Sequence, residues 1–205
     1  LTRRRIGATT PSLSGFVVLL ALRGRDPDTP HHRILFPEHY DDEFDAVFGT
    51  RSRAAHPATD PTVYVSAPND PALRPNDDSD AWFVLVNAAR HGRGSRSLVD
   101  WDAPGLAESY ADRILAIMAA RAVDVRDRVL WRQILSPADL ERRTMTPGGS
   151  IYGTSSNGAL AAFLRPANRS PVDGLFLVGG SSHPGGGLPL VTLSAEIVDR
   201  MVRER

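Results

Sequence analysis

The feature that most constrains this chain is residues 174–203, where an apolar run, a glycine-rich loop and a helical pattern follow one another. Residues 175–178 are apolar without polar alternation, which predicts a strand covered on both faces. Five of the residues 179–187 are glycine, so this backbone needs positive φ angles or is closely approached by another group. A helix is predicted from Pro189 to Arg203, and its first N–H groups favour an electron-rich ligand. A simple strand-to-helix turn is the alternative.

The composition excludes several classes of chemistry. The chain has 205 residues, a formal net charge of zero and no cysteine. The neutral balance gives no indication of a nucleic-acid partner, and the missing cysteine excludes disulfides and thiolate chemistry. All 24 basic residues are arginine, so there is no lysine for a Schiff base or a Walker loop. The longest apolar run, residues 16–22, is far shorter than the ~20 residues that span a bilayer.

Strand and helix patterns are interspersed before the C-terminal segment, without regular βαβ alternation. Strands are predicted at residues 12–22, 31–36, 62–67, 82–88 and 127–135. Helices are predicted at residues 38–48, at 104–121 and directly after the N-cap Ser136. These patterns predict an α+β fold with a mixed, largely antiparallel sheet flanked by helices. The terminal strand–loop–helix is solitary, which is typical of one piece of a larger sheet.

Helical spacing also predicts which side of two helices is buried. In the helix at residues 104–121, the apolar positions that recur at this spacing are Leu106, Tyr110, Ile114, Ile117 and Met118. In the helix at residues 38–48, the predicted apolar side consists of Tyr40, Phe44, Val47 and Phe48.

Several polar clusters do not match an established site pattern. No G-x-G-x-x-G follows a predicted strand, so no dinucleotide-binding fingerprint is present. A metal site could be imagined at His31, His32, Glu38 and His39. Adjacent residues on a strand point to opposite faces, however, so surface histidines are favoured. Asp77, Asp78 and Asp80 lack an EF-hand pattern and are predicted to form a solvated loop.

Ser181, Ser182 and His183 allow a serine hydrolase as an alternative. The segment lacks the final glycine of the nucleophile elbow G-x-S-x-G. Triad members also converge from separate segments rather than from neighbouring positions.

The run from Gly174 to Leu188 reads G-x-F-L-x-G-G-S-S-H-P-G-G-G-L. It closely resembles the C-terminal signature of bacterial-type phytoene desaturases, which are FAD-dependent carotenoid desaturases grouped with the retinol saturases. Further stretches that resemble this family are residues 36–44, 60–65, 99–102 and 146–153. Two positions depart from its pattern, since Ser182 replaces the usual threonine and Leu190 replaces a frequent glycine.

The resemblance implies that the chain is the C-terminal portion of such an enzyme, because the family's N-terminal G-x-G-x-x-G is missing from it. A first residue other than methionine agrees with this expectation. Residues 1–165 would belong to the substrate-binding domain, and residues 166–205 would be the last segment of a Rossmann-like FAD domain. The implied cofactor-binding residues lie on the loop and the following helix: Gly179, Gly180, Gly187, Leu188, Pro189, Leu190 and Val191. No catalytic residue, general base or metal ligand is assigned.

The implied substrate is a long apolar isoprenoid of carotenoid biosynthesis, which loses hydride from an allylic carbon to the flavin. Residues 16–22 and 82–86 would hold it by apolar contact. The other implied partner is the N-terminal FAD-binding part of the same protein, and the 205-residue chain alone is expected to be inactive. The implied location is cytoplasmic, with peripheral contact to the cell membrane as an option. A non-catalytic lipid- or partner-binding module with the same fold is the alternative.

Overall fold

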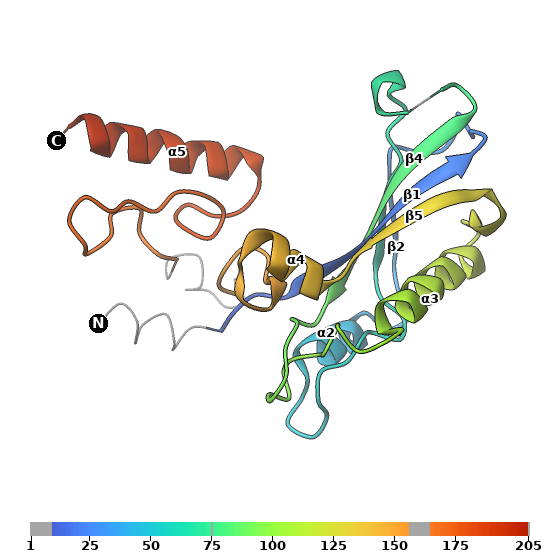
Figure 1. Cartoon of the computed structure of the whole chain (residues 1–205), viewed down its shortest axis with the longest axis horizontal. Helices are drawn as coiled ribbons and strands as arrows, with labels where there is room; N and C mark the ends of the chain where they lie inside the picture. Colours follow the sequence, from blue (N-terminus) through green and yellow to red (C-terminus); the bar gives the residue numbers. More distant parts are fainter. Residues whose placement is uncertain (1–9, 75, 156–164, 205) are drawn as a thin grey trace. The chain divides into compact units, whose positions relative to one another are not determined.

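The computed structural model describes residues 10–74, 76–155 and 165–204, which fall into two compact units (Figure 1). One unit is Leu13–Gly149, and the other combines the described residues of Leu1–Ser12 and Ser150–Arg205. The boundary predicted at residue 165 concerns the division between substrate and cofactor portions of a larger protein, and it stays a prediction.

The larger unit contains a five-stranded antiparallel sheet in the order β2-β3-β4-β1-β5 (Figure 1). Its strands are β1 (Ser14–Arg23), β2 (His32–Leu35), β3 (Val63–Ser66), β4 (Ser79–Ala88) and β5 (Val129–Leu135). The α+β class and the five strands predicted for this region are confirmed. β1 lies between β4 and β5, as expected for a strand whose residues are apolar on both faces.

One face of this sheet packs against α3 (Leu106–Ala120). Alternate residues of β1 and β4 point to that face, because side chains along a strand alternate between the two faces. The Phe16 ring lies 5.0 Å from the Tyr110 ring and 5.3 Å from the Trp101 ring, measured between centroids. The core contributed by β1, β4 and α3 consists of Phe16, Val18, Leu20, Leu22, Trp82, Val84, Val86, Tyr110, Ala111, Ile114, Leu115 and Met118. The predicted apolar side of α3 is confirmed.

The helix α2 (Tyr40–Phe48) forms as predicted, but its predicted apolar side is buried only in part. Its buried residues are Glu43, Ala46 and Val47, whereas Tyr40 is 49% exposed. The reason is a polar anchor: the Glu43 carboxylate accepts hydrogen bonds from the Thr62 backbone N–H and from Asn87 Nδ2, both at 2.9 Å. This anchor orients α2, so the predicted side is correct only in part: Val47 is buried and Phe44 and Phe48 are half-buried, whereas Tyr40 is exposed.

The helix α4 (Pro137–Thr144) begins at the predicted N-cap. The Asp139 N–H donates to Ser136 Oγ at 3.3 Å, and the Ser136 N–H donates to the Asp139 carboxylate at 2.9 Å. This reciprocal pair is a capping box, which satisfies two N–H groups at the helix start.

The smaller unit contains α5 (Leu188–Arg203), which confirms the predicted terminal helix. The predicted buried strand before it is not formed. Phe176 forms an isolated bridge with Arg169 rather than part of a strand, and Leu175 and Val178 are 49% and 58% exposed. A parallel strand needs neighbours on both sides, and the described residues of this unit provide none. Within the described ranges, no helix combines the length and the apolar character needed to cross a bilayer.

Candidate functional site

The glycine loop, residues 179–187, leads into the N-terminus of α5. Gly179 and Gly187 have φ angles of 115° and 96°, a region that side chains other than glycine's rarely adopt. A Cβ atom at either position would meet nothing within 4 Å. Backbone conformation therefore explains both glycines, and the space beside them is open to a ligand in this chain.

Other glycines of the smaller unit are required by contacts within the chain itself. A Cβ at Gly186 would lie 2.1 Å from Cδ1 of Tyr152, and a Cβ at Gly153 would lie 2.8 Å from Cβ of Ser181. The expectation that a group closely approaches this backbone is correct at Gly186. The approaching group, however, is an aromatic side chain of the same chain.

Arg165 joins the two segments that meet at this contact. Its Nη1 donates to the carbonyl oxygens of Tyr152 and Gly180, each at 3.0 Å. Tyr152 has a φ angle of 63°, an uncommon conformation for a bulky residue that persists only where the surroundings fix it. The guanidinium of Arg165 and the backbone of Gly186 provide these fixed contacts.

Three buried polar residues hold the glycine loop onto α5: Asn168, Ser182 and Ser194. Ser194 Oγ accepts from the Gly179 N–H at 3.2 Å and from Asn168 Nδ2 at 3.0 Å. Ser182 Oγ donates to the Gly179 carbonyl oxygen at 3.0 Å. Neither Asn168 nor Ser194 is among the residues predicted for the site. One available signal was that Ser194 interrupts the apolar positions Leu190 and Val198, which lie one helical turn away on either side.

The start of α5 leaves fewer free donors than the sequence suggests. The Val191 N–H donates to the Gly187 carbonyl oxygen at 2.9 Å, and Pro189 has no N–H. The N–H groups of Leu188 and Leu190 have no partner among the described residues. Four of the predicted cofactor-binding residues, at positions 188–191, lie at the start of α5. Two of them, Leu188 and Leu190, therefore retain an N–H that a ligand can use.

The serine–histidine alternative is not supported by the local geometry. Ser182 is buried, and its hydroxyl is committed to the Gly179 carbonyl. Among the described contacts, the His183 side chain makes no hydrogen bond to Ser181 or Ser182. The hydrogen bonds of His183 are made by its backbone: its N–H donates to the Pro166 carbonyl oxygen, and its carbonyl oxygen accepts from Asn168 Nδ2. No activated nucleophile results from this arrangement.

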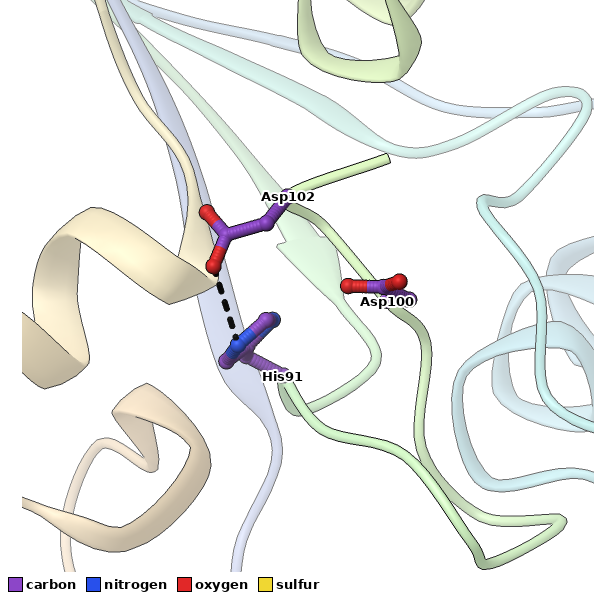
Figure 2. A group of neighbouring side chains, drawn as sticks. All are labelled: His91, Asp100 and Asp102. Carbon is purple, nitrogen blue, oxygen red and sulfur yellow. Dashed lines mark ion pairs between the residues drawn. The ribbon is translucent and has the colours of Figure 1, made fainter. Parts of the chain in front are cut away.

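Among the described residues, one group of side chains is of the types that bind metal ions and lies close enough together to do so. It consists of His91, Asp100 and Asp102 (Figure 2). His91 Nε2 lies 3.5 Å from the Asp102 carboxylate, as the dashed line in Figure 2 marks. Its Nδ1 accepts the Trp101 backbone N–H at 3.2 Å. Because Nδ1 accepts this hydrogen bond, the ring proton lies on Nε2. The nitrogen that faces the two carboxylates therefore has no lone pair for a metal ion.

Both carboxylates of this group already have cationic partners. Asp100 pairs with Arg93 at 2.7 Å, and Asp102 pairs with Arg142 of α4 at 2.9 Å. The hydrogen bond from Arg142 lowers the pKa of Asp102. The group is therefore a hydrogen-bonded tether from the segment after β4 to α4. No sequence motif indicates this group, because the fold and not a local pattern brings its members together.

The histidines weighed as metal ligands make other contacts. The rings of His31 and His32 stack at 4.1 Å between centroids, and His32 Nδ1 shares a hydrogen bond with the Tyr64 hydroxyl at 2.8 Å. The expectation that these neighbours point to opposite faces was wrong, because β2 begins at His32 and His31 lies before the strand. In the acidic loop, Asp77 pairs with Arg74.

The sheet face opposite α3, here called the open face, is largely apolar. One row of paired residues crosses all five strands and consists of Ile34, Tyr64, Leu85, Val17 and Leu135. The next row is apolar at its centre, with Phe83 and Leu19, and polar toward its ends, with His32, Ser66 and Gln133. Trp131 follows on β5. Strands lie ~4.8 Å apart, so a row across five strands extends about 19 Å. Phe83 and Trp131 are 37% and 56% exposed, so this apolar surface is accessible in this unit.

Comparison with known proteins identifies relatives over nearly the whole chain, although no protein-family model matches it. The chain is 32% identical to the 1-hydroxycarotenoid 3,4-desaturase of Flavobacterium sp. (strain P99-3) over 93% of its length. It is 31% identical over 95% of its length to the 4,4'-diapolycopene oxygenase of Methylomonas sp. It is 30% identical over 94% of its length to the lycopene-forming phytoene desaturase of Paracoccus sp. (strain N81106 / MBIC 01143). The chain spans 37% to 38% of the length of these three relatives.

Proposed function

Because the chain is a relative of bacterial-type phytoene and carotenoid desaturases, we propose that it is the C-terminal portion of a flavin-dependent desaturase of apolar isoprenoids. The observation that carries this proposal is the similarity over more than nine-tenths of the chain to enzymes named for carotenoid substrates. The glycine loop and the open face supply a cofactor contact and an apolar contact that such an enzyme requires.

The glycine loop fits one side of a flavin. The backbone at Gly179 and Gly187 can be approached without steric hindrance, and the Leu188 and Leu190 N–H groups are unpaired among the described residues. Bound FAD would supply the hydride acceptor, which no side chain of this chain can replace. The residues proposed to contact it are Gly179, Gly180, Gly187, Leu188, Pro189, Leu190 and Val191. Their task is to orient the cofactor and to donate N–H groups toward its electron-rich edge.

The exposed apolar residues before α5 support the proposed domain assignment. Leu175 and Val178 have the composition of a buried parallel strand but lie exposed in this chain. We propose that residues 166–205 complete a Rossmann-like FAD domain, in which strands from the N-terminal part of the protein cover this segment. Residues 1–165 then form part of the substrate domain.

The open face is the proposed contact surface for the isoprenoid. The strands predicted for this task are retained, but half of their side chains lie in the core beneath α3. Contact is therefore assigned to the less buried residues of the alternate set on β1 and β4, namely Leu19, Phe83 and Leu85, whereas Val17 in the same set is buried. An apolar row of about 19 Å matches an extended hydrocarbon, and its side chains bind by exclusion of water. A cytoplasmic location with peripheral membrane contact fits a substrate that partitions into lipid.

The test is reconstitution of the complete polypeptide with FAD. We expect stoichiometric flavin binding and conversion of a carotenoid precursor to a product with additional conjugated double bonds, followed by absorbance and chromatography. The 205-residue chain alone, which contains no G-x-G-x-x-G, is the matched control and should show neither property. A complete polypeptide that lacks a G-x-G-x-x-G and binds no flavin would instead favour the non-catalytic binding module.

A further inference from the structure

The two backbone groups of Gly179 are both held by buried side chains. Its N–H donates to Ser194 Oγ at 3.2 Å, and its carbonyl accepts from Ser182 Oγ at 3.0 Å. Ser194 Oγ also accepts from Asn168 Nδ2, so its own proton is left for Ser182 Oγ at 3.4 Å. Each proton in this chain of hydrogen bonds therefore has one direction, which fixes the start of the glycine loop.

The side-chain amide of Asn168 has only one acceptable orientation. Its Nδ2 lies 2.9 Å from the carbonyl oxygens of Leu177 and His183, in addition to its contact with Ser194. A flipped amide would place Oδ1 against two carbonyl oxygens, which can only accept. The backbone carbonyl oxygen of Asn168 also accepts a hydrogen bond from the Leu177 N–H at 2.8 Å. One residue thus clamps positions 177 and 183, on both sides of the first half of the loop.

The clamp occupies several carbonyls around the first half of the loop and leaves several of the loop's N–H groups without a partner. The carbonyl groups at 177, 179, 180 and 183 all have side-chain donors, supplied by Asn168, Ser182 and Arg165. The N–H groups of Gly180, Ser181, Gly185 and Gly186 have no partner among the described residues. These free N–H donors suit an electron-rich ligand, because such a ligand can accept hydrogen bonds from them.

We infer that Asn168 and Ser194 are positioning residues for the bound flavin. They do not touch the cofactor. They would hold the glycine loop in the arrangement that leaves its free N–H groups available to an electron-rich part of the flavin. This inference rests on the proposed function, and it differs from a role in stability alone because it predicts a change in the electronic properties of the flavin.

The decisive variant is Asn168→Asp in the complete polypeptide reconstituted with FAD. Aspartate has the same shape but places acceptor oxygens against the Leu177 and His183 carbonyls, so the loop must rearrange. We expect the Kd for FAD to rise about tenfold or more. The flavin that still binds should have a lower midpoint potential, because fewer N–H groups stabilise the negative charge of its reduced form. Spectroelectrochemical titration measures this potential independently of turnover.

Ser194→Ala is the second variant, and Ser170→Ala is the matched control. Ser170 Oγ accepts the Val172 N–H at 3.0 Å in the same unit but has no contact with the loop. Ser194→Ala should lower the flavin potential in the same direction as Asn168→Asp, whereas Ser170→Ala should leave it unchanged. If Asn168→Asp fails to fold, the potential of Ser194→Ala decides the matter. A wild-type potential in Ser194→Ala would overturn the inference, and a wild-type protein that binds no flavin would overturn the proposed function with it.

Discussion

The aromatic ring of Tyr152 lies on the backbone of Gly186, so closely that a Cβ atom there would stand 2.1 Å from Cδ1 of the ring. The φ angle of Gly186 lies outside the left-handed region, so this contact alone explains the glycine. We expect Gly186→Ala to destabilise the chain by about 1–3 kcal/mol, since the ring must move or the loop must shift. Thermal unfolding followed by circular dichroism measures the effect.

A double-mutant cycle separates this contact from other causes. Tyr152→Ala removes the ring, and Gly186→Ala should then cost much less in that background than in the wild type. An equal cost in both backgrounds would show that the alanine collides with something other than Tyr152.

The buried carboxylate of Glu43 supports a second prediction. It accepts hydrogen bonds from the Thr62 N–H, from the Thr62 hydroxyl and from Asn87 Nδ2. Glu43→Gln replaces one acceptor oxygen by an NH2 group that faces these donors. We expect a loss of about 1–3 kcal/mol in the free energy of unfolding, measured by urea titration. The exposed Glu38→Gln is the matched control, and an equal effect of the two substitutions would argue against the anchor.

Glu43 also shows why one part of the fold could be predicted from the sequence and another could not. Local patterns are sufficient for the capping box at Ser136, because both partners lie within one helical turn. The orientation of α2 depends on Thr62 and Asn87, which are 19 and 44 residues away from Glu43 along the chain. Periodicity describes the helix itself and contains no information about such distant partners.

The glycine loop shows the same division at the site. Its composition and spacing predict a glycine loop before a helix, and α5 begins within one residue of the predicted position. That the loop binds a ligand stays a prediction. The residues that shape the loop, Asn168 and Ser194, lie outside the motif and have no recognisable spacing relative to it. The predicted strand at residues 175–178 depends on neighbouring strands that the described residues do not supply.

A third prediction concerns pH. The hydrogen bond from Arg142 lowers the pKa of Asp102. A carboxyl group whose pKa is lowered on folding adds stability above its unfolded pKa of about 3.9, and this contribution is lost as the pH falls through the folded pKa. Arg142→Gln should therefore destabilise the chain at pH 7 by no more than about 1 kcal/mol, because both side chains are about half exposed.

The difference between Arg142→Gln and the wild type should shrink as the pH falls below about 4. Urea unfolding at a series of pH values gives this difference directly. Arg143→Gln is the control, since Arg143 is exposed and has no ion pair with the described residues. A difference that is independent of pH would assign the effect of Arg142 to packing rather than to charge.

The last prediction uses two adjacent residues of β4 that point to opposite faces of the sheet. Phe83 lies on the open face and is 37% exposed, whereas Val84 is 1% exposed within the core. Phe83→Arg places its charge in solvent, so the 205-residue chain should fold with a similar unfolding temperature. Val84→Arg must bury an unpaired charge and should prevent folding, because such burial costs several kcal/mol. Thermal unfolding of the two variants checks this contrast without any ligand.

In the complete polypeptide, Phe83→Arg should also raise the KM for the isoprenoid, because it places a charged side chain beside Leu19 on the open face. Flavin content should stay at the wild-type level, since the glycine loop lies in the other unit. Phe83→Leu keeps the surface apolar and is expected to retain most of the affinity. An unchanged KM in Phe83→Arg, with normal folding and flavin content, would show that the substrate does not use the open face. A raised KM in Phe83→Arg together with a nearly normal KM in Phe83→Leu would instead assign substrate contact to this side of β4.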